Sequence, residues 1–464
     1  MIPSDTTSLA AAGLAASAVS AWSAAEPRGT GEQEEDAVHY ANFWARSHQL
    51  LKALPVKPKR NAAERAAAEA ILAASRAARD RFLAAHAEWI YDRLTKGRTT
   101  FVRVEDLVYD AAAAFPGLVP TREEVAAETS LDQRDKDGVE IDQGLFIAHV
   151  LANPQAGQHL CHAMLLPRRD SEEFATKFAR DGVLDLGAAR LHREGRAVHL
   201  TAVNPRFLNA EDDTTLDEME IATDVAILDP STSIVVLRGG TVDQAKYRRQ
   251  RIFGAGINLT HLYRGKIPYL WFPRRDLGYV HKIFRGVATP DLLPDDVAGR
   301  GHEKLWVAAV DTFAIGGHCQ LLLTMDYVIA STNAFMTLPA RKEGIIPALA
   351  NLRLPRFVGD RIARQAIQYG RRLECDSPEG RMICDEVVPA AEMDGAIARV
   401  VDGLTSSGAV GAIGNRRAFR VGAEPLDLFR RYFAVYAREQ AYCHFSPALI
   451  ANLEQHWNAA HRAL

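Results

Sequence analysis

Apolar residues recur at helical spacing through the first part of the chain, up to about Asp185. Asn61 followed by Glu64 has the form of a capping box, and the helical repeat after it ends at Gly97. This repeat consists of Leu72, Phe82, Leu83, Trp89, Ile90 and Leu94. The pattern predicts a helical N-terminal domain over residues 1–190.

Between about Arg196 and Pro389 the pattern changes to short apolar runs that alternate with helical repeats. Strands are predicted at 197–203, 233–237, 305–310 and 327–330, and a helix at 211–228. Because strands that alternate with helices build α/β structures, residues 191–390 are predicted to form an α/β core. Helical spacing then returns at 426–442 and 447–457, which predicts a C-terminal helical region over 391–464. Its aromatic side chains favour a place at a subunit interface.

Composition narrows the class of protein. The 464 residues carry a net charge of −3, so the chain as a whole has no basic footprint for nucleic acid. Its five cysteines are scattered, which argues against a disulfide framework and favours a reducing, cytoplasmic setting.

No window of the sequence approaches the roughly 18 apolar residues of a membrane span. Leu9–Val19 is read as a mobile or loosely helical N-terminus, because no basic residue of a signal peptide precedes Arg28.

Two glycine-rich segments suggest chemistry. In the first, an apolar run meets Gly254-Ala-Gly256, which permits a tight turn that aims consecutive N–H groups outward. In the second, the strand at 305–310 is followed by Gly316-Gly317 and a predicted helix, whose first N–H groups suit a developing oxyanion. A tight turn with close backbone packing would explain either segment alone. The order of the two segments and their separation along the chain say more about the family than either segment alone.

The order of these segments resembles that of the crotonase (enoyl-CoA hydratase/isomerase) superfamily. Its landmarks match this chain at 204–210, 254–259, 314–321 with 325–330, 335–347 and 353–359. The resemblance covers about residues 196–390 and implies an α/β fold with a crotonase-type ββα superhelix core. The helices before and after would then be an N-terminal extension and a C-terminal region. Members of this superfamily form trimers or hexamers, so a homotrimer or homohexamer is expected.

The resemblance also implies roles for individual residues. The backbone N–H groups of Ile257 and Gly317 would form an oxyanion hole for the enolate of an acyl-CoA thioester. Gly256, Asn258 and Gly316 would contact the substrate beside them. Arg206 would lie near the CoA phosphates. The expected small-molecule partner is therefore a CoA thioester.

The chain departs from the superfamily at its two acid–base positions. Hydratases use two glutamates, which correspond here to Gln320 and Ala340. Neither residue titrates near neutral pH, so water addition would lose both of its proton carriers. Glu343 lies nearby but is assigned to the turn before Gly344. A hydratase is therefore disfavoured.

One branch of the superfamily combines this loss with a long helical N-terminal extension, and the chain resembles it over nearly its full length. Its members are dioxygenases of glycopeptide-antibiotic biosynthesis that act on an arylacetyl-CoA and O2 without metal or organic cofactor. The sequence likewise has no Gly-x-Gly-x-x-Gly dinucleotide loop and no clear set of two histidines and one carboxylate for iron. No cofactor and no metal ligand are therefore predicted.

Four side chains are candidates for the substrate pocket. Glu211 could accept a hydrogen bond from a substrate phenol or be an acid at a helix start. Arg275 could reach the substrate or be a solvated surface charge. Gln320 is predicted to line the pocket near the thioester, and Ile345 to line an apolar space for O2, although an isoleucine is ordinarily core.

Two other readings of the function stay open at this point. The first is a hydratase, isomerase or thioesterase with an unusual base such as Glu211 or Glu343. The second is a non-catalytic acyl-CoA-binding protein. Three nearby patterns are set aside: His318 is more typical of a packed or capping histidine than of a base, His159 and His162 lack a further metal ligand, and 131–144 lacks the register of a calcium loop.

Overall fold

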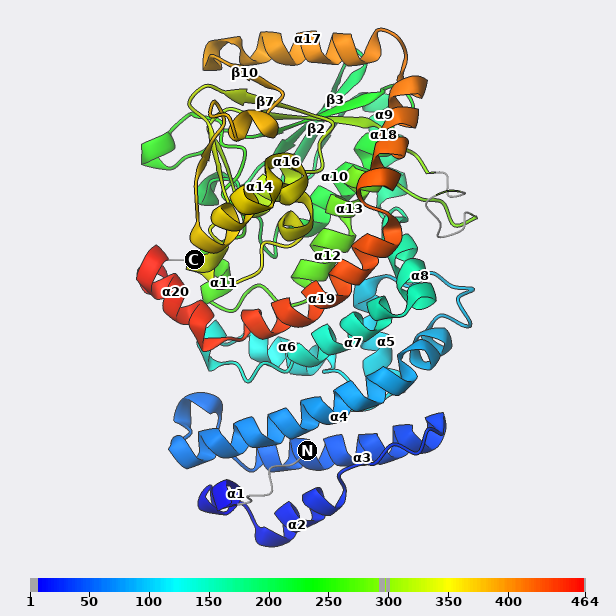
Figure 1. The fold of residues 1–464 in the computed structure, drawn as a ribbon, viewed down its shortest axis with the longest axis vertical. Coiled ribbons are helices and arrows are strands. Elements are labelled where there is room, and N and C mark those ends of the chain that lie inside the picture. Colours follow the sequence, from blue (N-terminus) through cyan, green and yellow to red (C-terminus); the bar gives the residue numbers. More distant parts are fainter. Residues whose placement is uncertain (1–6, 292–296, 298–300, 463–464) are drawn as a thin grey trace.

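The structure is a computed structural model that describes residues 7–291, 297 and 301–462. Helices fill the N-terminal part of the chain, and α3 and α4 lie side by side at one end of the molecule (Figure 1). These helices are α1 (Thr7–Ala11), α2 (Ala16–Ala24), α3 (Gln33–Lys52), α4 (Ala62–Leu94), α5 (Val104–Ala114), α6 (Arg122–Thr129), α7 (Ile141–Ala152), α8 (Pro154–Leu165) and α9 (Ser171–Asp181).

The start of α4 confirms the predicted capping box. The Asn61 side chain accepts a hydrogen bond from the Glu64 N–H at 3.0 Å, and the Glu64 carboxylate accepts one from the Asn61 N–H at 2.8 Å. The stretch before α3 is helical, and Trp22 of α2 is completely buried, with its indole N–H donating to Ser47 at 2.8 Å. This buried side chain attaches α2 to α3.

The central sheet has seven strands in the order β1-β2-β3-β4-β5-β7-β10. β1 and β2 pair antiparallel, and the strands from β3 to β10 run parallel. A smaller sheet has the order β6-β8-β9. The strands are β1 (Val183–Asp185), β2 (Ala189–Glu194), β3 (Ala197–Ala202), β4 (Ile234–Gly239), β5 (Leu305–Val310), β6 (Phe313–Ile315), β7 (Tyr327–Ser331), β8 (Phe335–Thr337), β9 (Leu373–Glu374) and β10 (Glu386–Val388).

The predicted domain boundary after residue 190 falls inside β2. All six residues of β2 pair with β3, and β1 adds to the same sheet, so the sheet begins at Val183. Apolar residues of all three predicted parts also join one core, for example Phe146, Leu200 and Phe433. The three-part division therefore stays a prediction about folding units, although the parts share their packing.

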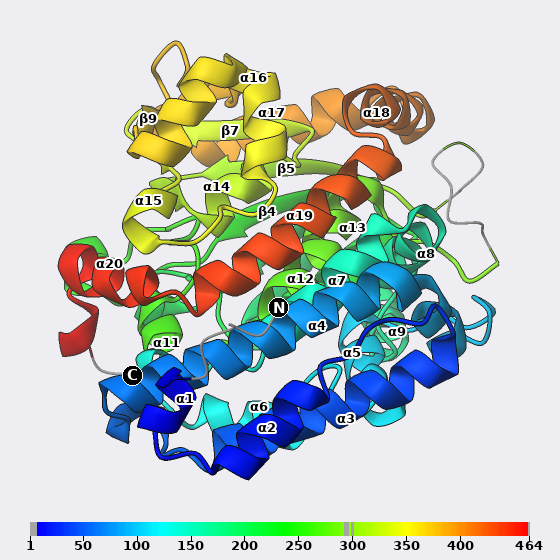
Figure 2. The same cartoon turned by 60° about the horizontal axis from the view of Figure 1, so that its bottom comes forward.

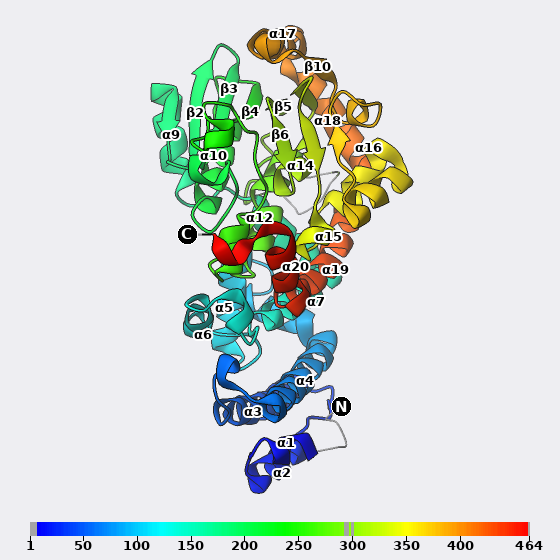
Figure 3. The ribbon, with the colours of Figure 1, turned by 90° about the vertical axis from the view of Figure 1, so that its left-hand side faces the viewer.

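Helices cover both faces of the large sheet (Figure 3). Met393 and Ile397 of α17 pack with Ile234 and Val307 on one face, while α10 packs on the other face (Figure 1). Every residue of β5 is buried, as expected for a parallel strand covered on both sides. The α-helices between residues 216 and 364 are α10 (Leu216–Leu228), α11 (Leu259–Tyr263), α12 (Trp271–Leu277), α13 (Tyr279–Arg285), α14 (Gly317–Leu322), α15 (Ala340–Glu343) and α16 (Ala350–Arg364).

The last helices are α17 (Met393–Thr405), α18 (Ala409–Ala423), α19 (Leu426–His444) and α20 (Pro447–Trp457). α19 lies along α7, which in turn packs on α4 (Figure 2). The aromatic side chains of α19 were expected to cover a subunit interface, but Phe429, Phe433 and Tyr436 are buried within the chain itself. They therefore do not indicate an interface.

Assembly as a trimer or hexamer stays a prediction that rests on the superfamily resemblance. We expect static light scattering at micromolar concentration to give a mass three or six times that of the chain. A monomer under those conditions would contradict this prediction. In the described part of the chain, no helix combines the length and apolar character needed to cross a bilayer.

Candidate active site

The segment at Gly256 lies pressed against the end of β6. Gly256 has a φ of 78°, and a Cβ on it would lie 2.9 Å from the Ile315 carbonyl oxygen and 3.3 Å from the Gly317 nitrogen. The Gly256 carbonyl accepts from the Glu211 N–H at 2.8 Å, and the Glu211 carbonyl accepts from the Asn258 N–H at 2.7 Å. Only glycine permits both this φ and this approach. The backbone of Ile257 is thereby held close to that of Gly317.

Two backbone N–H groups are available at this junction. Gly316, with a φ of 54°, turns the chain out of β6, and α14 begins at Gly317. The first N–H groups of a helix have no partner within it. Among the described residues, the N–H groups of Ile257 and Gly317 meet no hydrogen-bond acceptor. Both residues line one cavity, where such a pair can stabilise an oxyanion.

The cavity gathers most of the predicted site residues. Those that line it are Glu211, Ile257, Arg275, Gly316, Gly317, Gln320 and Ile345. Its free space is about 30 Å³, close to the volume that one molecule occupies in liquid water. An aryl group can therefore enter only if the lining side chains move apart.

Arg275 and Glu211 form a buried ion pair on the cavity wall. The Nε and Nη2 atoms of Arg275 donate to the two carboxylate oxygens of Glu211 at 2.7 and 2.9 Å. Arg275 also donates to Asp276 at 2.6 Å and to the Gly317 carbonyl at 3.0 Å. The Tyr279 hydroxyl donates to Glu211 as well. This network fixes both members of the pair beside the N–H of Gly317.

The structure excludes one of the two readings that the sequence left open for Arg275 and for Glu211, and their substrate contacts stay predictions. Arg275 is 2 % exposed, so it is not a solvated surface charge. Burial acts to lower its pKa, but the carboxylates of Glu211 and Asp276 outweigh burial and raise it above the ordinary value. Glu211 lies five residues before Leu216, the first residue of α10, so it is not an acid of the first helical turn.

Both positions that carry glutamates in hydratases lie at the cavity without a carboxylate. Gln320, on α14, accepts a hydrogen bond from Arg275 at 3.1 Å through its amide oxygen. Ala340 is the first residue of α15 and also lines the cavity. The cavity therefore has no carboxylate at either position that the superfamily resemblance assigns to the proton carriers of water addition.

A different carboxylate enters the same cavity. Glu343, at the end of α15, lines the cavity and is 7 % exposed. Burial raises its pKa to about 7. Sequence reasoning assigned this residue to a turn and otherwise named it only as a possible base of a hydratase, isomerase or thioesterase. The sequence could have indicated this position through spacing. Glu343 follows Ala340 by three residues, and residues three apart on a helix share a face, so the two side chains would face the same pocket.

The His318 ring supports the backbone at Gly256. The ring is buried, and its Nδ1 accepts the N–H of Gly256 at 3.1 Å. Burial lowers its pKa to about 4, so the ring is neutral at pH 7. A Cβ on Gly254 would lie 2.1 Å from this ring, which explains the glycine there. The ring therefore orients Gly256, next to Ile257.

Three predicted substrate contacts lie outside the cavity lining. Gly256 packs against the β6 end, and the Asn258 side chain caps α11 by accepting from the N–H of Thr260 at 3.1 Å. Arg206 is exposed, and its carbonyl accepts from the Gln244 side chain at 3.0 Å. The exposed residues that follow Gln244 include Lys246, Arg248 and Arg249.

His159 and His162 each share a hydrogen bond with another group of the chain. His159 shares a hydrogen bond with the Tyr91 hydroxyl at 2.7 Å, and His162 with the Thr289 carbonyl at 3.2 Å. Neither belongs to the two groups of potential metal ligands found among the described residues.

Comparison with known proteins decides the family. The chain is 48% identical over 397 residues to the (3,5-dihydroxyphenyl)acetyl-CoA 1,2-dioxygenase of Amycolatopsis orientalis, an alignment that covers 85% of this chain and 90% of that one. Residues 298–413 match the enoyl-CoA hydratase/isomerase family. The chain belongs to the crotonase superfamily. Within it, the chain is an oxidoreductase of the dioxygenase family rather than a hydratase.

More distant members of the superfamily match only part of the chain. The short-chain-enoyl-CoA hydratase of Clostridium acetobutylicum is 26% identical over 243 residues, which covers 52% of this chain and 84% of that enzyme. A crystal structure of an enoyl-CoA hydratase from Mycobacterium avium subsp. paratuberculosis K-10 gives a TM-score of 0.46 at 20% identity and covers 58% of this chain and 98% of its own.

Proposed function

We propose that the chain converts (3,5-dihydroxyphenyl)acetyl-CoA and O2 to (3,5-dihydroxyphenyl)glyoxylate and free CoA, a step of glycopeptide-antibiotic biosynthesis. The observation that carries the proposal is the 48% identity to a dioxygenase of this substrate over 85% of the chain. The site geometry supports it, because Ile257 and Gly317 offer an oxyanion hole while Gln320 and Ala340 lack the carboxylates of a hydratase.

The reaction begins at the carbon between the thioester and the aryl ring. Loss of one proton from this carbon leaves an enolate, whose oxygen accepts hydrogen bonds from the N–H groups of Ile257 and Gly317. Arg275 holds Glu211 in place beside this site at 2.7 Å. In that position Glu211 can accept a hydrogen bond from a phenol of the ring, and Ile345 supplies an apolar wall next to the bound O2.

The substrate itself supplies the electrons for the oxygen chemistry. The enolate gives one electron to O2, and the two radicals combine to form a peroxide on the α carbon. The terminal peroxide oxygen attacks the thioester carbonyl and expels CoA as its thiolate. The second α hydrogen then leaves as a proton to solvent, its C–H electron pair forms the keto C=O bond as the O–O bond breaks, and the glyoxylate anion that results keeps both atoms of O2. We therefore propose that neither a metal nor an organic cofactor takes part.

The CoA portion of the substrate is assigned to the surface near Arg206. This arginine is exposed and lies beside a segment that carries Lys246, Arg248 and Arg249. Cationic side chains at an exposed position suit the phosphates of CoA.

Oxygen uptake by metal-stripped protein tests the function. We expect one O2 consumed and one CoA released per thioester, with both atoms of labelled O2 in the glyoxylate. A hydratase, a thioesterase or a binding protein would consume no O2. Activity that disappears on chelation and returns only with iron would refute cofactor independence while leaving the dioxygenase function in place.

A carboxylate at position 320 should slow the reaction. The Gln320 amide oxygen accepts from Arg275 at 3.1 Å, so Gln320→Glu would compete with Glu211 for the guanidinium and add negative charge near the enolate. We expect O2 consumption to fall at least about tenfold, roughly 1.4 kcal/mol in the barrier. Thioester binding should change less, because CoA is held elsewhere.

The matched control is Gln49→Glu, which adds the same charge at an exposed position of α3 and should leave O2 consumption unchanged. The prediction fails if Gln320→Glu consumes O2 at the parent rate at a pH where the new carboxyl is ionised.

A further inference from the structure

Glu343 is an unpaired carboxyl in the cavity that holds the oxyanion hole. It lines this cavity together with Ile257 and Gly317 and is 7 % exposed. Two other carboxylates line the cavity, Glu211 and Asp276, and both accept hydrogen bonds from Arg275. Among the described residues, the Glu343 side chain has neither a hydrogen-bond donor nor a cation as partner. Such a group is costly to bury, so its presence in the cavity calls for an explanation.

We propose that Glu343 is the base that removes the α proton of the bound thioester, an inference that rests on the proposed dioxygenase function. A base must lie within reach of the proton that it takes and must not be held by another partner. Glu211 and Asp276 are held by Arg275, and His318 holds the Gly256 N–H, so these groups are engaged. Glu343 alone among the cavity's described carboxylates is free to act.

The proton transfer balances within the reaction. The α C–H bond breaks, its electron pair becomes the enolate, and the proton forms an O–H bond with the Glu343 carboxylate. When the peroxide expels CoA as a thiolate, that proton passes to the thiolate sulfur. Glu343 returns to its carboxylate form, and no oxidant other than O2 is needed.

The electrostatic surroundings suit a base at neutral pH. Burial raises the pKa of Glu343 to about 7, so a large share of the group is ionised at pH 7 and binds a proton readily. The charged groups that face the cavity are the Arg275 guanidinium with its partners Glu211 and Asp276. Tyr436 of α19 also lines it, and burial raises the pKa of its hydroxyl well above the usual range, so it stays neutral.

Hydrogen exchange at the α carbon tests this step separately from the oxygen chemistry. Under anaerobic conditions in D2O, the parent protein should exchange the α hydrogens of (3,5-dihydroxyphenyl)acetyl-CoA, with a rate that rises as pH increases through about 7. Glu343→Gln keeps the size and a hydrogen-bond donor but cannot take the proton. We expect it to lose at least about 100-fold of both exchange and O2 uptake, and Glu343→Asp to retain part of each.

The matched control is Glu140→Gln. Burial also raises the pKa of Glu140 to about 7, but this residue does not line the cavity and accepts the Tyr269 N–H at 2.6 Å. It should exchange at the parent rate. Parent-like exchange in Glu343→Gln would overturn the assignment of the base while leaving the dioxygenase function intact. A parent protein that exchanges the α hydrogens but consumes no O2 would instead overturn the function.

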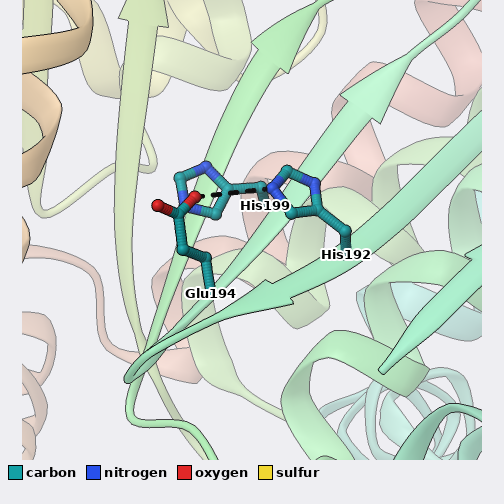
Figure 4. Close-up of side chains that lie close together, drawn as sticks. All are labelled: His192, Glu194 and His199. Carbon is teal, nitrogen blue, oxygen red and sulfur yellow. Dashed lines mark ion pairs between the residues drawn. The ribbon is translucent and has the colours of Figure 1, made fainter. Parts of the chain in front are cut away.

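A second, independent feature lies on the surface of the large sheet. His192 of β2 and His199 of β3 are direct cross-strand partners, and their rings stack with centroids 4.7 Å apart. Glu194 lies two residues after His192, on the same face of the strand. Figure 4 shows the three side chains converging. The Nε2 atoms of His192 and His199 lie 3.7 and 3.6 Å from one Glu194 oxygen.

We propose that His192, Glu194 and His199 bind a zinc ion. Tetrahedral zinc with bonds of 2.0–2.1 Å requires ligand atoms about 3.3–3.5 Å apart, close to these separations. The two strands hold the three side chains on one face of the sheet, and the stacked rings must turn so that both Nε2 atoms point at one ion. His192 and Glu194 are exposed, which leaves room for water as a fourth ligand.

Calorimetric titration of chelator-treated protein with Zn²⁺ tests this site. We expect one ion per chain, lost in His199→Ala, weakened in Glu194→Gln and retained in the control His456→Ala, which changes a separate exposed histidine. O2 consumption should not change in any of them. A parent protein that binds no zinc overturns the proposal. So does zinc that persists in His199→Ala and is lost in His261→Ala, which would assign the ion to Asp212, Asp213 and His261.

Discussion

Gly317→Ala should abolish most of the O2 consumption while the protein remains folded. A Cβ at this position would lie 2.4 Å from Oε2 of Glu211 and 2.9 Å from Nη2 of Arg275. Contacts this short force either the neighbouring side chains or the backbone of residue 317 to move. Glu211 and Arg275 cannot yield cheaply, because each is buried and held by the other at 2.7 and 2.9 Å. The added methyl group must therefore displace either the ion pair or the N–H of residue 317.

Either displacement disturbs the oxyanion hole. Removing one donor from such a site in other enzymes costs about 10²–10³ in rate. We expect O2 consumption by Gly317→Ala to fall at least about 100-fold, roughly 2.7 kcal/mol in the barrier. Binding of a nonreactive CoA thioester analogue should fall by a smaller factor, because the CoA portion contacts a different surface. Steady-state O2 uptake and calorimetric binding measure the two effects.

The control for this variant is Gly403→Ala, within α17. A Cβ there would have no atom within 4 Å, so this alanine should be tolerated and should leave O2 consumption unchanged. If folded Gly317→Ala consumed O2 within a few-fold of the parent, Gly317 would not contribute an N–H to the reaction as proposed.

The sequence predicted the fold best where burial is simplest. The run at 305–310 was predicted as a strand, and β5 has these bounds, with all six of its side chains buried as a continuous apolar run implies. The helix predicted at 211–228 begins instead at Leu216, because Glu211 pairs with the segment at Ile257 and Asp212 accepts the N–H of Thr214 at 3.0 Å. A side chain that satisfies the backbone locally competes with the helix, and apolar spacing does not report that competition.

In the candidate site, too, the sequence predicted local features and missed contacts between distant residues. The positions of Ile257, Gly317 and Gln320 followed from motif order, since each motif is local in sequence. The pairing of Arg275 with Glu211 joins residues 64 positions apart, so no local pattern could reveal it. The same holds for the isolation of Glu343, which depends on which groups surround its carboxyl in the folded chain.

The unpaired Glu343 carboxyl makes the free energy of unfolding depend on pH. Burial raises the pKa of Glu343 from its ordinary 4.5 to about 7, so between these values the folded chain binds a proton that the unfolded chain releases. The stability that the neutral carboxyl contributes is fully present below pH 4.5 and is lost as pH rises through 7. A pKa difference of this size corresponds to a loss on the order of 3 kcal/mol above pH 7.

Glu343→Gln removes this loss, because an amide stays neutral at every pH in both states. We expect the variant and the parent to have similar free energies of unfolding near pH 4.5. At pH 8 the variant should be more stable by up to about 3 kcal/mol. Urea denaturation at the two pH values measures the difference, and other groups that titrate equally in both proteins cancel from it. Glu69→Gln, which changes an exposed carboxyl on α4, should show no such pH-dependent gain.

A variant that gains stability at pH 8 and loses turnover would show that the parent retains an unpaired carboxyl for its chemistry at a cost in stability. Equal stability of Glu343→Gln and the parent at pH 8 would contradict the raised pKa. It would mean that the Glu343 carboxylate is solvated or paired in solution, and its availability as a base would then need another explanation. The pH dependence of unfolding thus examines the same carboxyl as hydrogen exchange, in a measurement that requires no substrate.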